Sequence, residues 1–402
     1  MVAWKNCMEH LAIKPSDHEL ATVIDRFLPS LNANRKYPAH TLQNLDALTK
    51  CRTPYMGGHM EACQGCAQVR TVYNSCRNRH CPKCGSIEKE KWIMKRELDL
   101  FPAKYFHVVF TVPDKLNELF MLQNQLMYNL LFTTAWDVMK DFGNDKKWIG
   151  GKLGMTAILH TWGQNLQYHP HLHLIVPGGA LMPNGKWKHA RNRGKYLFKV
   201  DMISNVFRAR FVKALRILEK ENKLSSPVPD RLFDNNWVVY AKRPFGGPKK
   251  VINYLGRYTH RTAISNDRIL NVDEQKVTFA WRDYRNNNKK QVTSLKGEDF
   301  LRLFCQHIVP AKFTRIRHYG FLSSACKKKA LALIRASLKA KPPVLKTPEG
   351  KTQQDMILER MGIKTGACAC CGGLMVVIQV LPNHFRKTSR APPGKLCPEN
   401  VD

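Results

Sequence analysis

One short stretch of the chain alternates imidazole and aliphatic side chains, and it limits the possible folds more than any other feature. Side chains alternate across a β-strand, so His169, His171 and His173 share one face while Leu172 and Leu174 share the other. The aliphatic face suits a hydrophobic core, which leaves the imidazoles facing a cleft. Two imidazoles two residues apart on a strand are close enough to bind one cation. We therefore expect a strand that holds a metal through His171 and His173.

A divalent cation at this strand needs a third protein ligand. Gln164 lies seven residues before His171 and reaches a neighbouring strand or turn if the chain reverses near Asn165. His160 and His169 are the competing candidates. An amide oxygen suits Mg²⁺ or Mn²⁺ better than zinc, and these two ions also accept phosphate oxygens. We therefore expect Mg²⁺ or Mn²⁺ at this site.

A second segment, about eighty residues further on, places two phenols one helical turn apart. Tyr254 and Tyr258 are the only tyrosines among 12 with this spacing, and they could act as nucleophiles. With Leu255 and a preceding valine they also form an ordinary apolar helix stripe, and spacing alone favours that structural role. Arg257 and Arg261 beside them favour a phosphate site, although a charged surface would look the same.

The charge balance of the chain points to a polyanionic partner. Its 402 residues carry 65 Lys and Arg against 31 Asp and Glu, a formal net charge of +34, and such an excess is typical of proteins that bind nucleic acid. The alternatives are a ribosome-associated protein or one that is merely basic. No apolar run approaches the roughly 18 residues that span a bilayer, and the first residues lack a secretory h-region. We expect a reducing, cytoplasmic location, where the 13 cysteines serve as metal ligands or free thiols.

Six of these cysteines lie between residues 51 and 84. Two Cys-x-x-Cys units fourteen residues apart are typical of a four-thiolate zinc site, because each unit offers two sulfurs to one tetrahedral ion. A pair of redox motifs is the alternative. The predicted ligands of this first zinc site are Cys63, Cys66, Cys81 and Cys84.

The remaining ligands of this region could form a second zinc site, with a structural cysteine and surface histidines as the equal alternative. Two of its members lie four residues apart, which is one helical turn. Basic residues surround the whole cluster, so the module is expected to face DNA. The predicted second set is Cys51, His59, Cys76 and His80.

The C-terminal region holds half of a possible third zinc site. Cys368 and Cys371 form another Cys-x-x-Cys unit, and only His384 and Cys397 remain there to complete it. A cysteine-rich turn is the alternative.

Strands and helices mix along the chain without regular βαβ alternation, which favours an α+β fold with an antiparallel sheet. Strands are predicted at residues 106–112, 156–160, 171–176 and 237–241, with a hairpin around 286–289. The predicted domains are a helical and zinc-binding DNA-binding domain over residues 1–100, a domain with the histidine strand and the tyrosine pair over 101–322, and a small basic C-terminal region over 323–402 with a possible zinc knuckle.

Four stretches together resemble the rolling-circle HUH transposases of bacterial insertion sequences, the two-tyrosine group related to Helitrons. They are residues 73–84, His169–Gly179, Tyr254–Ser265 and Arg315–Phe321, which span about residues 50–325. In that family the histidine pair falls on His171 and His173, and the tyrosine motif on Tyr254 and Tyr258. Some relatives use a single tyrosine, whereas both positions are filled here. The resemblance implies that residues 101–322 form an antiparallel-sheet HUH nuclease domain with tyrosine nucleophiles.

The resemblance also implies a mechanism and partners. A metal held by the histidines polarises a phosphodiester of single-stranded DNA, and a tyrosine oxygen attacks it to leave a 5′-phosphotyrosine link and a free 3′-OH. The link conserves bond energy, consistent with the lack of a GxxxxGK[ST] phosphate loop. The substrates would be single-stranded DNA and transposon-end hairpins, with a host helicase or replication supplying unwinding and the protein at the nucleoid when bound. The arginines expected to contact DNA are Arg77, Arg79, Arg257, Arg261, Arg315 and Arg317.

Two other functions fit the same residues. A related initiator or relaxase would nick a replication or transfer origin, but the N-terminal zinc module and the lack of a helicase domain favour the transposase. A zinc-dependent DNA-binding regulator would carry out no chemistry. In every case many lysines and arginines would release counterions from phosphates, so DNA affinity should fall steeply with salt.

Overall fold

The chain forms two compact units. The computed structural model describes residues 18–191, 197–242, 256, 262–283, 286–343, 352–361 and 366–385. Residues 50–77 and 366–385 belong to the first unit, and residues 18–49 with the described residues from 78 to 361 belong to the second. This division differs from the expected boundaries at residues 100 and 322. The reason is that a C-terminal strand pairs with the cysteine-rich segment and so joins the first unit. The residues on either side of that cysteine-rich segment belong to the second unit.

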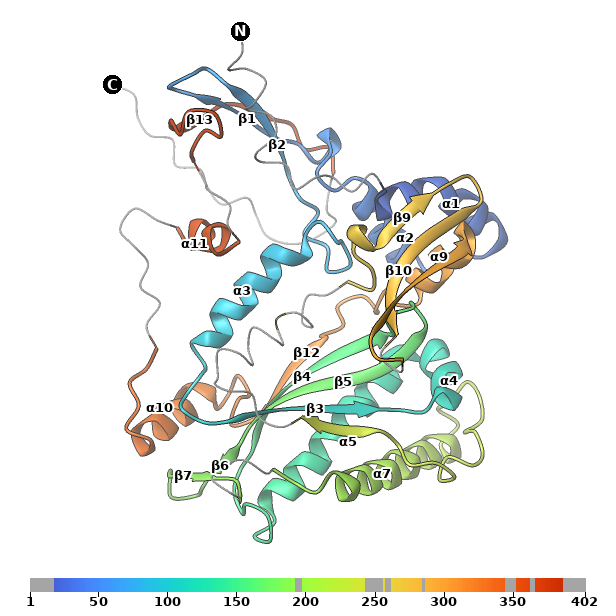
Figure 1. The fold of residues 1–402 in the computed structure, drawn as a ribbon. Helices are drawn as coiled ribbons and strands as arrows, with labels where there is room; N and C mark the ends of the chain where they lie inside the picture. The colour runs from blue at the N-terminus through green and yellow to red at the C-terminus, as the bar shows by residue number, and fades with distance from the viewer. Residues whose placement is uncertain are drawn as a thin grey trace. The chain divides into compact units, whose positions relative to one another are not determined.

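The second unit is built on a five-stranded sheet with the strand order β12-β4-β5-β3-β8, antiparallel at every pairing (Figure 1). The strand predictions are confirmed, although β8 begins two residues later than expected. An α+β fold with antiparallel sheets is therefore also confirmed. The strands are β3 (Tyr105–Thr111), β4 (Gly154–Trp162), β5 (Tyr168–Pro177), β8 (Val239–Lys242) and β12 (Ile316–Gly320).

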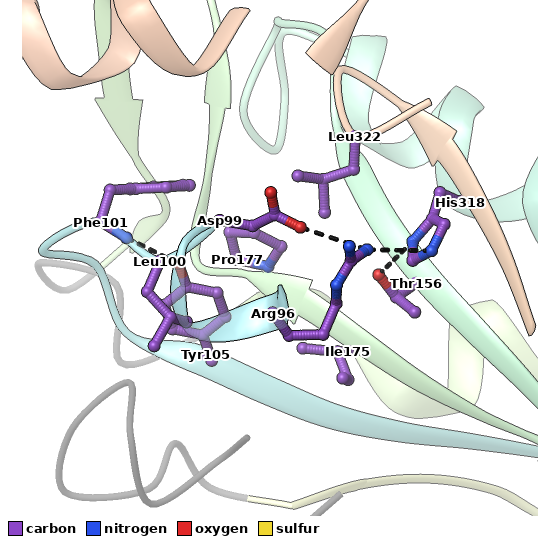
Figure 2. Close-up of a pocket in the computed structure, with 10 residues that line it drawn as sticks. All are labelled: Arg96, Asp99, Leu100, Phe101, Tyr105, Thr156, Ile175, Pro177, His318 and Leu322. Atoms are coloured by element: carbon purple, nitrogen blue, oxygen red, sulfur yellow. Dashed lines mark hydrogen bonds and ion pairs between the residues drawn. The ribbon is translucent and has the colours of Figure 1, made fainter. Parts of the chain in front are cut away.

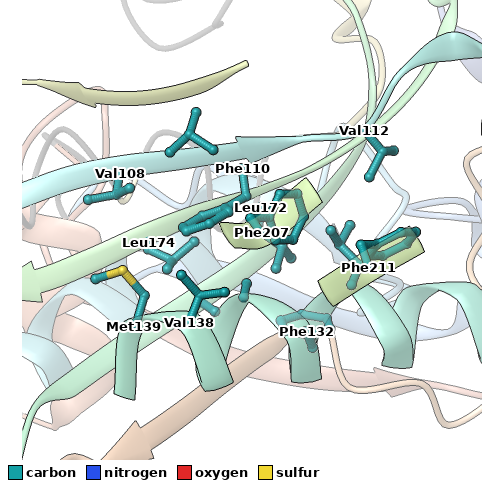
Figure 3. Close-up of a cluster of buried hydrophobic side chains, with 14 of the residues drawn as sticks. Val108, Phe110, Val112, Phe132, Val138, Met139, Leu172, Leu174, Phe207 and Phe211 are labelled. Carbon is teal, nitrogen blue, oxygen red and sulfur yellow. The ribbon is translucent and has the colours of Figure 1, made fainter. Parts of the chain in front are cut away.

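Helices α5 (Asn124–Asn144) and α7 (Val200–Lys220) cover one face of this sheet. Phe207 of α7 meets Phe110 of β3 edge to face, with ring centroids 4.8 Å apart. Leu172 and Leu174, the aliphatic partners of the histidines, are completely buried in the same core (Figure 3). Full burial of a side chain of this size contributes about 1.5–3 kcal/mol, so this core fixes which face of β5 points away from the helices.

The register of the strands places histidines from three strands on the face opposite α5 and α7. His160 of β4 lies directly across from His171 of β5. Val109 of β3 lies across from His173, and His107 is two residues from Val109 on the same face. The predicted alternation of β5 is thus confirmed, and it is extended by imidazoles from both neighbouring strands.

Smaller elements frame this sheet. A second sheet has the strand order β11-β10-β9, and its β10–β11 pairing confirms the predicted hairpin. Its strands are β9 (Ile269–Val272), β10 (Lys276–Asp283) and β11 (Lys289–Lys296), and β6 (Gly179–Leu181) pairs with β7 (Trp187–His189). The remaining helices are α1 (Leu20–Asn34), α2 (Ala39–Thr49), α3 (Gly85–Glu97), α4 (Asn117–Leu122), α9 (Gly297–Cys305), α10 (Lys327–Ser337) and α11 (Gln353–Arg360).

The first unit is a small three-stranded antiparallel sheet. Its strands are β1 (Gly58–Cys63), β2 (Val69–Tyr73) and β13 (Met375–Leu381), in the order β13-β1-β2. The last residue of β1, Cys63, pairs with the first residue of β13, Met375. The end of β1 and the start of β13 therefore lie side by side at Cys63. Across the described residues of both units, no helix has the length and apolar character that a membrane span requires.

Candidate active site and metal centres

Three imidazoles converge on the histidine face of the central sheet. The Nε2 atoms of His171 and His173 lie 3.1 Å apart. One ring nitrogen from each of His160, His171 and His173 lies within 4.8 Å of the other two. Two ligands that each lie about 2.1 Å from one ion, at octahedral or tetrahedral angles, are about 3.0–3.4 Å apart. The spacing of the two β5 histidines therefore fits a shared cation.

The Nδ1 atoms of His171 and His173 are within hydrogen-bond distance of neighbouring groups. The Nδ1 of His171 lies 2.6 Å from the carbonyl oxygen of His169, so Nδ1–H donates there and Nε2 carries the lone pair. The Nδ1 of His173 lies 2.8 Å from Nε2 of His107 on β3. Burial, and secondarily the charge of His169, lowers the pKa of His171 to about 4. A neutral ring whose Nδ1 is engaged is the form in which Nε2 binds a metal.

The candidates for the third ligand occupy different places. Gln164 lies in the turn after β4, where its backbone carbonyl accepts a hydrogen bond from Arg268. The Nδ1 of His169 lies 3.6 Å from a carboxylate oxygen of Asp114. Among the three candidates, His160 is the one that joins the imidazole cluster. A role for Gln164 stays a prediction.

The tyrosine motif cannot be placed in the same way. Tyr254, Arg257, Tyr258 and Arg261 lie outside the described residues, so their roles stay predictions. Gly256, between the two tyrosines, is described and buried within the second unit.

A group of four cysteines in the first unit differs from the predicted set. The Sγ atoms of Cys63 and Cys371 lie 3.4 Å apart, and those of Cys66 and Cys368 lie 3.6 Å apart. All four sulfurs lie within 4.8 Å of one another. The backbone N–H groups of Cys371 and Cys370 lower the pKa of Cys368 to about 6. The C-terminal Cys-x-x-Cys unit therefore forms a four-sulfur group with the unit of Cys63 and Cys66.

The predicted first zinc site is therefore wrong in half of its ligands. Cys81 and Cys84 are buried in the second unit, where the N–H of Cys84 donates to the carbonyl of Cys81. Sequence proximity favoured pairing the two N-terminal Cys-x-x-Cys units. The β1–β13 ladder instead delivers Cys368 to Cys66 from 302 residues away. His384, one of the two residues left to complete the C-terminal half-site, is not in this group of sulfurs; its ring lies beside Tyr55, with ring centroids 6.2 Å apart. The other, Cys397, lies outside the described residues.

The predicted second zinc site is only partly brought together. In the first unit the N–H of Cys76 donates to Sγ of Cys51 at 3.4 Å. The Nε2 of His59 lies 3.0 Å from a carboxylate oxygen of Glu61 instead of near these sulfurs. His80 is buried in the second unit, and desolvation lowers its pKa well below the usual value. Cys51 and Cys76 thus remain candidate ligands, while His59 has a carboxylate partner.

The arginines expected to contact DNA have different surroundings. Arg77 is exposed in the first unit. In the second unit, Nη1 of Arg79 donates to the carbonyl of Phe313 at 2.6 Å. Arg315 is only 6% exposed, and burial lowers its pKa to about 10. Arg317 lies over the ring of Phe313. The burial of Arg315 argues against a direct phosphate contact, because its guanidinium is committed to the interior.

Two pockets of the second unit differ in size. The pocket in Figure 2 measures about 30 Å³, roughly the space of one water. In it Nη1 of Arg96, near the end of α3, lies 3.1 Å from a carboxylate oxygen of Asp99 and 3.1 Å from Nε2 of His318 on β12, and the second contact joins α3 to the sheet. A second pocket of about 320 Å³ lies beside His169, within the range of about 300–1,000 Å³ typical of ligand sites. Its polar lining includes Asp114, Lys115, Arg231, Asn235 and Asn236.

Sequence reasoning missed His107 altogether. This residue lies in a predicted strand, but a single histidine on a strand is more often structural than functional. The only available signal was parity, because His107 would share a face with His171 and His173 once β3 was paired with β5 in the observed register.

Comparison with known proteins agrees with this geometry. Residues 154–330 match a family model described as putative transposase, and residues 23–112 match one described as transposase zinc-binding domain. The chain is 37% identical over 353 residues to putative transposase y4qJ of Sinorhizobium fredii, with 84% of this chain and 88% of that protein covered. It is 27% identical over 359 residues to the transposase for insertion sequence element IS801 of Pseudomonas savastanoi pv. phaseolicola, with 83% and 82% covered. No solved structure matches.

The cysteine groups fit the zinc-binding description, and the family match covers both the histidine sheet and the cysteine-rich segment. The chain therefore belongs to the IS91/IS801 family of insertion-sequence transposases.

Proposed function

We propose that the chain is a metal-dependent HUH endonuclease and strand transferase, which nicks single-stranded DNA at transposon ends through a 5′-phosphotyrosine intermediate. The observation that carries this proposal is the convergence of His160, His171 and His173 on one face of an antiparallel sheet. The family supports DNA as the substrate, and the net charge of +34 suits a polyanion.

The three imidazoles would hold a divalent cation. Their fit rests on the 3.1 Å spacing of the His171 and His173 Nε2 atoms and on the Nδ1 contact of His171 with a backbone carbonyl. When bound, the cation supplies Lewis acidity and offsets charge on the scissile phosphodiester. Three nitrogen ligands favour Mn²⁺ over Mg²⁺, because Mg²⁺ prefers oxygen. An oxygen from Gln164 in place of one imidazole would shift that preference toward Mg²⁺.

Tyr254 and Tyr258 are the proposed nucleophiles. The phenolic oxygen of one tyrosine forms a bond to phosphorus as the bond from phosphorus to the 3′-oxygen breaks. The phenol loses its proton, and the departing oxygen becomes a 3′-OH. Because the protein–DNA link is itself a phosphodiester, a later attack by a 3′-OH joins strands without ATP. The second tyrosine would accept a second cleaved end while the first is occupied.

The proposed partners are single-stranded DNA, transposon-end hairpins and a host helicase or replication machinery. Lys and Arg outnumber the acids by more than two to one, so the affinity for single-stranded DNA should fall steeply as salt rises from about 50 to 200 mM. A flat response would contradict extensive backbone contacts.

A covalent-adduct assay tests the proposal. An oligonucleotide labelled at its 3′ end and carrying a transposon-end sequence is incubated with the protein and Mn²⁺ or Mg²⁺, and then run on a denaturing gel. Wild-type protein should give a metal-dependent labelled protein band. The double variant Tyr254→Phe, Tyr258→Phe should abolish this band, and so should the single variant His171→Ala. Tyr240→Phe, which changes an exposed tyrosine of β8, should not. An adduct with the double tyrosine variant would overturn the nucleophile assignment.

A further inference from the structure

We propose that Cys63, Cys66, Cys368 and Cys371 hold one structural Zn²⁺ that joins the C-terminal segment to the cysteine-rich segment. The matching zinc-binding family model ends at residue 112, so it does not include half of these ligands. The proposal is independent of the DNA chemistry proposed above.

The two Cys-x-x-Cys units have the same backbone conformation. The N–H of Cys63 donates to the carbonyl of Gln68, and the N–H of Cys368 donates to that of Gly373, five residues on in each case. The carbonyls of the same two cysteines accept from the residues four positions later, Ala67 and Gly372. Both of these residues have left-handed backbones, with φ of 57° and 75°. Two equal knuckles thus face each other, as in four-cysteine zinc ribbons.

Backbone N–H groups donate to sulfurs of both knuckles. Gly65 donates to Cys63 at 3.3 Å, Cys370 to Cys368 at 3.4 Å, and Gly373 to Cys371 at 3.4 Å. Such bonds stabilise thiolates, which are the form that binds zinc. Tetrahedral thiolates about 2.3 Å from zinc are about 3.8 Å apart, close to the observed 3.4 and 3.6 Å between knuckles.

Glycines allow the knuckles to approach each other. A Cβ at Gly373 would lie 3.0 Å from the sulfur of Cys63, and one at Gly65 would lie 3.3 Å from the sulfur of Cys371. Each glycine therefore borders a sulfur of the opposite knuckle. Since Cys63 ends β1 and pairs with Met375, the first residue of β13, a shared ion would join the two strands at this end of their ladder. The C-terminal segment is then an essential part of the zinc module.

Zinc content of the purified full-length protein, measured by mass spectrometry of the metal, tests the proposal. Cys63→Ser, Cys66→Ser should lose one zinc per chain, and Cys368→Ser, Cys371→Ser should lose the same one. The variant with all four changes should lose no more than either pair. Cys370→Ser is the matched control, because it alters the cysteine between two ligands, and it should keep full zinc. Additive losses, or full zinc in the Cys368→Ser, Cys371→Ser variant, would overturn the shared site.

Alkylation of wild-type protein covers the case in which these variants fail to fold. Cys66, Cys370 and Cys371 are all exposed. With zinc bound, N-ethylmaleimide should label Cys370 quickly and spare the other two, and a chelator should release Cys66 and Cys371 together. Equal labelling of all three before chelation, or disulfide-linked peptides from the two knuckles, would contradict the proposal. Neither result would affect the tyrosine chemistry.

Discussion

Gly256 lies directly against Ile93 of helix α3. A Cβ at Gly256 would come within 2.6 Å of Ile93 Cγ1, closer than van der Waals contact allows. Helix α3 begins at Gly85, with Cys84 of a Cys-x-x-Cys unit at its N-terminal cap. Gly256 stands midway between Tyr254 and Tyr258 in the sequence. The helix that follows the cysteines therefore contacts the centre of the proposed nucleophile motif.

Gly256→Ala is expected to weaken covalent adduct formation. The added methyl group must displace Ile93 or its own backbone, and overpacking of this kind costs about 1–3 kcal/mol. Ile93→Ala removes the atoms that the methyl would strike. The double variant should therefore recover adduct yield relative to Gly256→Ala alone, as measured on the denaturing gel with thermal unfolding recorded in parallel. Wild-type yield from Gly256→Ala would show that this contact does not position the motif.

Much of the central sheet could be predicted because its pattern is local. Alternation in residues 169–176 places leucines toward the core and imidazoles away from it, and burial of Leu172 and Leu174 settles that choice. The identity of the third imidazole could not be predicted in the same way. It depends on the β4–β5 register, which sets His160 opposite His171 and leaves Gln164 in the turn beyond.

The prediction of the cysteine ligands was wrong in part for a related reason. A Cys-x-x-Cys unit identifies two ligands, but its spacing says nothing about which other unit completes the site. Nearness in sequence favoured Cys81 and Cys84 as the partners of Cys63 and Cys66. The pairing of β1 with β13 is a contact over some 300 residues, and no pattern within either segment specifies it.

His160→Ala should abolish metal-dependent adduct formation, while Gln164→Ala should retain it. The imidazole of His160 lies in the three-histidine cluster, so the substitution would remove a proposed direct ligand. The loss of metal-dependent adduct should exceed the effect of about 10–100-fold that is typical of residues that only orient a ligand. Titration of Mn²⁺ against adduct yield provides the measurement. The reverse ranking of the two variants would identify Gln164 as the third ligand.

His107→Phe should raise the Mn²⁺ concentration needed for half-maximal adduct by about 10–100-fold. His107 contacts the Nδ1 of His173 at 2.8 Å and therefore orients that ring. A phenyl group fills similar space but offers no hydrogen bond. Because His107 acts through His173, saturating Mn²⁺ should restore most of the yield. A defect that persists at saturation would indicate a role in folding or chemistry instead.

The free energy of unfolding should fall as the pH drops from 6.5 toward 4, and His307 should account for part of the loss. His307 is 1% exposed, its Nε2 lies 2.9 Å from the carbonyl of Leu166, and burial lowers its pKa from 6.5 to about 4. The unfolded chain therefore binds a proton in this range that the folded chain does not. The contribution of the neutral imidazole to the free energy of unfolding is fully present above pH 6.5. It is lost as the pH falls below that value, by up to about 3 kcal/mol for one such group.

Urea unfolding of His307→Gln at pH 7.5 and pH 5 checks this expectation. Glutamine retains an N–H donor without a titrating ring, so the difference in unfolding free energy between the two pH values should shrink. His189→Gln, a change at an exposed residue of β7, is the control and should leave that difference unchanged. Burial also lowers the pKa of His171 and His318 to about 4, so a reduced pH dependence should remain. An unchanged difference in His307→Gln would mean that His307 is not the neutral, buried imidazole that its surroundings require.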